Sequence, residues 1–183
     1  CIPTVAFGDV RIGMAQVSIK VTVKDQGVSD AIARVTAVDP NLIPPLFKNW
    51  GEYQIKATRA RFLAARGPDG KPWTPLNRVY AAGKRGPGIL RESGQLMGSL
   101  VYQVTANQLA WGSPKVYAAI NQKGGTIVPR SADALVFRMG NRVVFARKVT
   151  IPARPYLGVS TEDREVMGQM ADDLLAEVWN GDR

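Results

Sequence analysis

The clearest alternation of apolar and polar side chains runs from Val17 to Lys24. Valine and isoleucine take every second position, with serine, lysine and threonine between them, which is typical of a strand with one buried face. We interpret residues 1–16, which precede it, as an N-terminal extension. A short helix is expected next, from Ser29 as its N-cap to about Val38, because Asp39-Pro40 would end it.

Two longer segments carry apolar residues at three- and four-residue spacing, the pattern of an amphipathic helix. The first has Pro44 and Pro45 in its first turn, where proline is tolerated, and ends near Arg66, just before Gly67-Pro68. The second is a C-terminal helix over residues 160–180, capped by Ser160 or Thr161 and followed by acidic residues in its first turn. Both apolar faces are expected to pack in the core.

Between these helices the sequence predicts two β-hairpins around a short helix. The first hairpin covers 99–113 with its turn near 106–108, and the short helix runs from Val116 to Gly124. The second hairpin covers 134–151, where Gly140-Asn141 suits a tight turn. Strands joined as hairpins imply an antiparallel sheet with helices packed on one face, so we expect one α+β domain spanning residues 1–183.

Residues 67–90 are the least regular stretch and are rich in glycine and proline. We predict a long basic loop that is extended or poorly packed until neighbouring molecules order it, with Trp73 anchoring its base. A solvated loop is the alternative. Five basic residues on or beside this loop are candidate contacts for a polyanion or a neighbouring subunit: Lys71, Arg78, Lys84, Arg85 and Arg91.

Charge is distributed unevenly along the chain. The net charge is +9, but the segment from Ser160 to the end has seven acidic residues against two arginines, a net of −5, so the preceding residues carry +14. A basic body with an acidic final helix suits a polyanionic neighbour, or self-association through opposite patches. The candidate contacts on the final helix are Glu162, Asp163, Asp172 and Asp173.

The composition excludes the commonest kinds of catalysis. The chain has no histidine, which removes Ser-His-Asp and Cys-His mechanisms and histidine-ligated zinc. Its one cysteine cannot form an internal disulfide, and the acidic residues before Thr161 form no obvious close pair. We therefore expect neither an enzyme nor a bound cofactor or metal. The longest apolar runs fall short of the ~20 residues of a membrane helix, so no membrane partner is expected.

Four segments occur in an order that resembles a known family: "FLAARGPDGKPWTPL", "ILRESGQLMGSL", "GSPKVYAAINQKGG" and "IPARPYLGVS". They resemble the phage virion morphogenesis, or tail completion, proteins of Mu-like and P2-like phages, over roughly Leu46 to Leu175. The family often has His-Gln where this chain has Asn121-Gln122.

The resemblance implies a structural protein of the virion neck or proximal tail end, assembled in the host cytoplasm. It would act as a tail terminator or tail completion factor, in contact with other neck, connector and tail-tube proteins. It would work as a homo-oligomeric ring, with six copies as the first expectation because phage tails usually have sixfold symmetry. Double-stranded DNA could then pass through the lumen. The alternative function is a DNA-binding accessory protein of phage assembly, which would use the basic residues of the loop.

The segment "IPARPYLGVS", residues 151–160, has two interpretations. Pro152 and Pro155 would hold the chain extended at low entropic cost, while Tyr156 and Leu157 anchor the final helix. As an assembly surface, the segment would leave Arg154 projecting towards an acidic helix of the next subunit. As a stiff connector, it would contact only its own chain.

Overall fold

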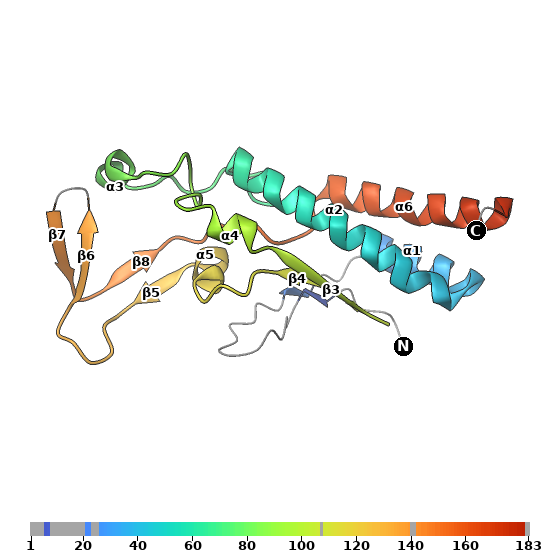
Figure 1. Ribbon diagram of the computed structural model, residues 1–183, viewed down its shortest axis with the longest axis horizontal. Coiled ribbons are helices and arrows are strands. Elements are labelled where there is room, and N and C mark those ends of the chain that lie inside the picture. Colours follow the sequence, from blue (N-terminus) through green and yellow to red (C-terminus); the bar gives the residue numbers. More distant parts are fainter. Residues whose placement is uncertain (1–5, 8–20, 23–25, 107, 140–141, 182–183) are drawn as a thin grey trace.

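The computed structural model describes residues 6–7, 21–22, 26–106, 108–139 and 142–181. Its helices and small antiparallel sheets confirm the predicted α+β class. The molecule is elongated: helix α1 (Gln26–Val38) and the C-terminal end of helix α6 (Thr161–Asn180) lie at one end, and a β-hairpin lies at the other (Figure 1). None of the helices in the described ranges is long and apolar enough to cross a bilayer.

The core forms where α2 (Ile43–Ala64) lies beside α6. A single turn of 3-10 helix, η1 (Pro40–Leu42), joins α1 to α2, and the prolines occupy the first turn of α2 as predicted. Trp50 is fully buried, and its indole N–H donates to the carbonyl of Met167 on α6, at 3.0 Å. Helix α2 ends at Ala65, which takes a left-handed conformation with φ of 52°.

The described strands form four separate antiparallel pairs rather than the one sheet expected from the sequence. The hairpin β3–β4 packs against α2 and buries Leu109 and Trp111 there, so a helix covers one face of this pair. Of the predicted strand Val17–Lys24, only Val21–Thr22 lies in the described part, and it is a strand. The pairs are β1 (Ala6–Phe7) with β2 (Val21–Thr22), β3 (Val101–Thr105) with β4 (Gln108–Gly112), β5 (Gly125–Ile127) with β8 (Val149–Ile151), and β6 (Leu135–Met139) with β7 (Arg142–Ala146).

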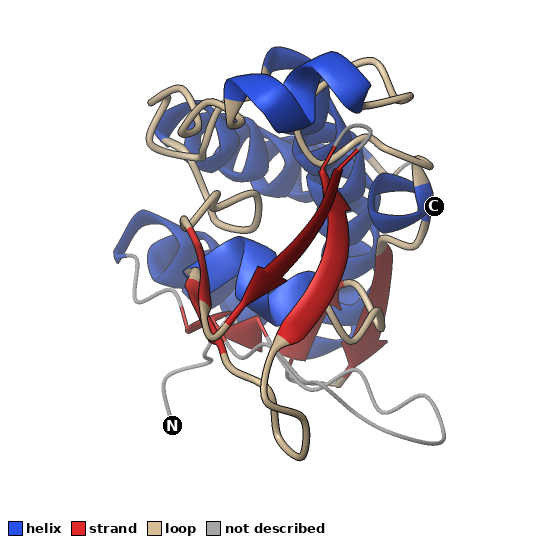
Figure 2. Cartoon of the chain, turned by 90° about the vertical axis from the view of Figure 1, so that its left-hand side faces the viewer, coloured by secondary structure: helices blue, strands red, loops and turns tan. Residues whose placement is uncertain are grey.

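Both predicted hairpins are confirmed, and the second is part of a longer projection. Residues 125–151, which we call the β-arm, form a ribbon in which β5–β8 makes the base and β6–β7 the tip. The predicted turn at Gly140-Asn141 lies outside the described residues. The β-arm occupies the end of the molecule opposite to the C-terminal end of α6 (Figure 1), and Figure 2 shows its strands in front of the helices.

Residues 67–90 are largely exposed but include one short helix and several contacts within the chain. Trp73 is 4% exposed, and its indole N–H donates to the carbonyl of Pro155 at 2.7 Å, which confirms its predicted anchoring role. Further along, Asn77 caps the short helix α3 (Arg78–Gly83), which sequence reasoning missed and which buries none of its residues. Two other short helices are α4 (Gln95–Gly98) and α5 (Ala118–Lys123), the latter close to its predicted position.

Candidate functional site

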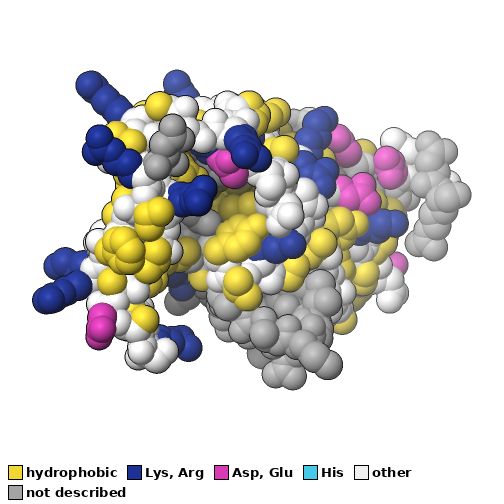
Figure 3. All heavy atoms as spheres, turned by 60° about the vertical axis from the view of Figure 1, so that its left-hand side comes forward, with side chains coloured by type: hydrophobic (Ala, Val, Ile, Leu, Met, Phe, Trp, Pro, Cys, Tyr) yellow, Lys and Arg dark blue, Asp and Glu magenta, His cyan; other side chains and the backbone are white. Residues whose placement is uncertain are grey.

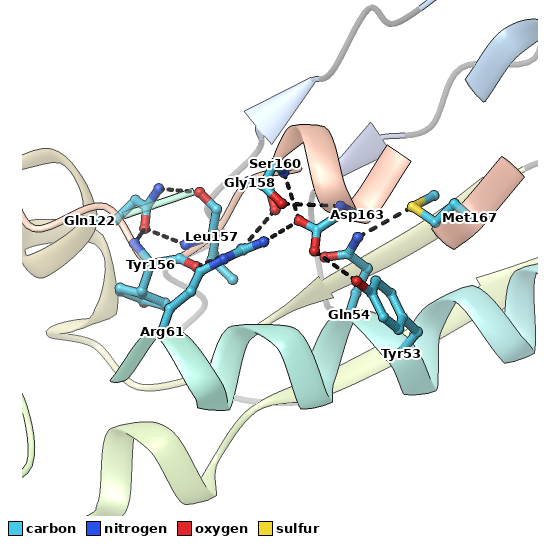
Figure 4. Close-up of polar contacts among 10 residues, drawn as sticks. All are labelled: Tyr53, Gln54, Arg61, Gln122, Tyr156, Leu157, Gly158, Ser160, Asp163 and Met167. Carbon is cyan, nitrogen blue, oxygen red and sulfur yellow. Dashed lines mark hydrogen bonds and ion pairs between the residues drawn. The ribbon is translucent and has the colours of Figure 1, made fainter. Parts of the chain in front are cut away.

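The segment 151–160 is a connector that runs from β8 to α6 and is held on both sides by its own chain. One side-chain amide, that of Gln122 on α5, satisfies three of its backbone groups (Figure 4). The Gln122 carbonyl oxygen accepts from the amides of Tyr156 and Leu157 at 2.9 and 3.0 Å, and its NH₂ donates to the Leu157 carbonyl at 2.9 Å. Gln122 thus supplies hydrogen bonds that a neighbouring strand would supply in a sheet.

A buried ion pair between Arg61 and Asp163 fastens the connector and α6 to α2 (Figure 4). The side chains are 9% and 4% exposed. Arg61 also donates to the carbonyls of Tyr156 and Gly158, at 3.1 and 2.8 Å. Since an isolated buried charge is costly, the pair and these carbonyls must act together.

Asp163 also completes the N-terminal cap of α6. Its carboxylate accepts from the Ser160 amide at 2.6 Å, and the Ser160 hydroxyl accepts from the Asp163 amide at 3.1 Å, so the two form a capping box. The Tyr53 hydroxyl donates to the same carboxylate at 3.2 Å. Burial and the charge of Asp163 raise the pKa of Tyr53 to about 12. Asp163, predicted as a contact for other molecules, therefore forms its contacts within the chain.

Arg154 does not project, so that prediction is wrong. The residue is 7% exposed, and its guanidinium donates to the carbonyls of Thr74 and Pro75 at 3.0 and 3.4 Å. Its backbone amide also donates to the Asn121 carbonyl at 2.8 Å. Burial lowers the pKa of Arg154. The geometry supports the connector interpretation of residues 151–160.

The five basic candidates of the loop region are divided between free surface and internal contacts. Lys71, Arg78 and Arg85 are exposed, and Lys71 lies 3.6 Å from Asp69. The Lys84 side chain is 5% exposed and pairs with Glu92 at 2.8 Å, an interaction that lowers the pKa of Glu92. Arg91 is partly buried and donates to the Pro87 carbonyl at 3.5 Å. The loop therefore offers fewer cations to a partner than its sequence suggests.

The acidic side of α6 is available to other molecules except where it pairs within the chain. Asp172 pairs with Arg34 of α1 at 2.8 Å, with both side chains half-exposed. The remaining exposed acidic residues of this helix are Glu162, Glu165, Asp173 and Glu177. Trp179, in the last turn, is 83% exposed. The exposed side of α6 is thus acidic, and its last turn carries a large apolar side chain in solvent.

The β-arm is the surface that sequence reasoning missed. None of its described residues is buried, although it carries Val136, Val143 and Phe145, which are 61, 51 and 71% exposed. Figure 3 shows Lys and Arg side chains projecting around exposed apolar ones at this end, while acidic side chains gather mainly towards the far side. The signal was present in "ALVFRMGNRVVFARKVTI", because apolar residues fall on both faces of the predicted hairpin. Its basic residues are Arg130, Arg138, Arg142, Arg147 and Lys148, against one acid, Asp133.

The described residues offer little for ligand or metal chemistry. They include no group of three or more histidine, cysteine, aspartate or glutamate side chains that could hold a metal ion. An open groove of about 430 Å³ lies between α2 and β3, lined by residues that include Glu52, Arg59 and Tyr102. The Tyr102 hydroxyl donates to Glu52 there at 3.2 Å, so the polar groups of the groove partly satisfy each other.

Comparison with known proteins agrees with the resemblance seen in the sequence. The phage virion morphogenesis family matches residues 23–176. The chain is also similar to the "Putative capsid assembly protein G" of Escherichia phage Mu, with 31% identity over 121 residues, which cover 61% of this chain and 67% of that protein. No solved structure matches. Because the family match extends over most of its length, the chain belongs to the phage virion morphogenesis family.

Proposed function

We propose that this phage virion assembly protein is a tail terminator or tail completion factor, which joins tail to head as a homo-oligomeric ring. The ordered segments that resemble tail completion proteins favour the tail position. The ring is favoured by one structural observation: the elongated subunit is electrically polarised. Its β-arm end is basic and its α6 end is acidic.

Polarity of this kind disfavours a twofold dimer formed through either end. A twofold contact brings the same patch of both subunits together, so it would oppose two basic or two acidic surfaces. A head-to-tail contact instead brings a basic surface against an acidic one. Heterologous contacts of this type close into a ring when the rotation between neighbours permits. Six copies would match the usual symmetry of a phage tail.

The test is a phage in which the gene carries an early stop codon. We expect lysates to contain DNA-filled heads and separate tails, with joined particles restored by the wild-type protein in trans. Missing heads, or heads that fail to fill, would overturn the tail assignment and favour a role in head assembly instead. A protein that stays monomeric both at high concentration and in particles would overturn the ring.

The competing prediction, a DNA-binding accessory protein, has a distinct signature. A monomer that binds duplex DNA through several phosphate contacts loses affinity steeply as salt rises. A ring component, in contrast, should contact DNA only after the ring has assembled. Lys84 pairs with Glu92 and Arg154 donates to the Thr74 carbonyl, both within the chain, which removes two of the cations on which a DNA-binding surface could depend.

A further inference from the structure

We propose that the tip of the β-arm docks on the acidic side of α6 in the next copy of this chain. This inference rests on the proposed ring and assigns its subunit contact. One surface is the exposed face of β6–β7, and the other is the C-terminal half of α6 with its exposed acidic residues Asp173 and Glu177.

The first argument is that the β-arm cannot bury its own apolar side chains. A two-stranded hairpin is marginally stable in water without a helix or further strands against it. In the β6–β7 pair Val136 lies directly opposite Phe145, and Arg138 lies opposite Val143. Strand alternation places these four side chains on one face, and all four are exposed. Helix α3 contacts β6 but leaves this face uncovered.

The exposed face of β6–β7 combines apolar side chains with positive charge. On that face Arg138 lies among the exposed side chains of Val136, Val143 and Phe145, so an occupant must offer both apolar area and negative charge. The last turns of α6 offer both: Asp173 and Glu177, four residues apart, lie exposed on one face of the helix, and Trp179 is exposed on another face of its last turn. Duplex DNA supplies the charge but has no apolar surface of similar size along its backbone.

The β-arm and α6 differ in net charge and in their position on the molecule. The β-arm carries five basic residues against one acidic residue, and α6 carries six acidic residues against one arginine. They lie at opposite ends of the elongated subunit (Figure 1), so the arm of one copy cannot reach the C-terminal half of its own α6. An α6 surface that receives the arm must therefore belong to another copy. Repetition of this contact is head-to-tail, as a ring requires.

The apolar part of the contact is tested by Phe145→Ser, with Leu63→Ser as the matched control. Leu63 is 61% exposed on α2, so both changes remove an exposed apolar side chain. Loss of a phenylalanine that becomes buried in the contact should raise the concentration for half-assembly about tenfold or more. The control should leave that concentration unchanged. Light scattering gives the assembled mass, and thermal melts verify that both variants stay folded.

The charged part is tested by reversal on each surface and then on both. Arg138→Glu reverses the charge on the arm face, and Asp173→Lys with Glu177→Lys reverses α6. The arm variant and the α6 variant should each lose assembly, and the chain that carries all three changes should recover most of it. Asp30→Lys on α1 is the control for a charge reversal elsewhere on an exposed helix.

These experiments distinguish failure of the docking inference from failure of the proposed ring. Arm and α6 variants that assemble like wild type would overturn the docking inference and leave the ring standing. Reversal of both surfaces without recovery would overturn the pairing of these two surfaces. Arm variants that assemble normally but bind duplex DNA less tightly would assign the arm to nucleic acid instead. Wild-type protein that forms no ring, alone or in particles, would overturn the proposed function.

Discussion

Asp163→Asn should be among the most destabilising single changes in this protein. The substitution keeps the size of the side chain and one oxygen that can accept from Ser160, but it removes the negative charge next to Arg61. Arg61 is 8% exposed, so its guanidinium would stay in the core with only neutral oxygens as acceptors, the carbonyls of Tyr156 and Gly158 among them. Loss of one member of a buried pair costs about 3–5 kcal/mol of unfolding free energy.

The matched control is Asp172→Asn, which breaks the pair with Arg34. Its side chains are 50% and 61% exposed, so the same chemical change should cost no more than about 1 kcal/mol. In a chain of this size the Asp163 variant should melt roughly 10 °C lower than wild type, and the control within about 4 °C of it. Thermal melts and urea titrations followed by circular dichroism measure both.

A double variant tests whether the uncompensated charge is the cause. Arg61→Leu combined with Asp163→Asn removes the charge that the single variant leaves buried, so the pair should cost less than the sum of the two single changes. Equal melting points for the Asp163 and Asp172 variants would refute the reasoning. So would strict additivity in the double variant.

The remaining predictions concern the connector and its surroundings. Gly158→Ala should destabilise the fold by roughly 1–3 kcal/mol, since φ is +151° and a Cβ would lie 2.7 Å from the Pro68 ring; urea titration measures the loss. Arg154→Glu should lower the melting temperature, because it places a buried carboxylate against two carbonyl oxygens, whereas Arg147→Glu on the exposed arm should not. The raised pKa of Tyr53 stabilises the folded state fully below pH 10, and this contribution is lost as pH rises through about 12. Tyr53→Phe should therefore flatten the decline of unfolding free energy between pH 10 and 12.

Local patterns were enough to predict most of the secondary structure. The proline pair placed the start of α2, the Ser160 cap placed α6, and period-two alternation placed both hairpins. These features depend on residues close together in the chain. The expected single sheet was not observed. The sequence of a hairpin determines how its own two strands pair, but it does not determine whether two hairpins join edge to edge.

The sequence did not show which charged side chains are buried and paired within the fold. Arg154 and Asp163 look like ordinary surface residues in their segments, and only the tertiary fold brings Thr74 and Arg61 against them. Their partners lie about 80 and 102 positions away, a separation at which no sequence pattern can identify a contact. The exposed β-arm is different, because the apolar residues on both faces of its hairpin are visible in the sequence.

The most direct test of the proposed function is a reconstruction of the particle neck, with this protein identified by a fused tag. We expect a closed ring of identical copies at the head-proximal end of the tail, with the β-arm of each copy against α6 of the next. A protein that is absent from the mature particle, or present only in the head shell, would contradict it.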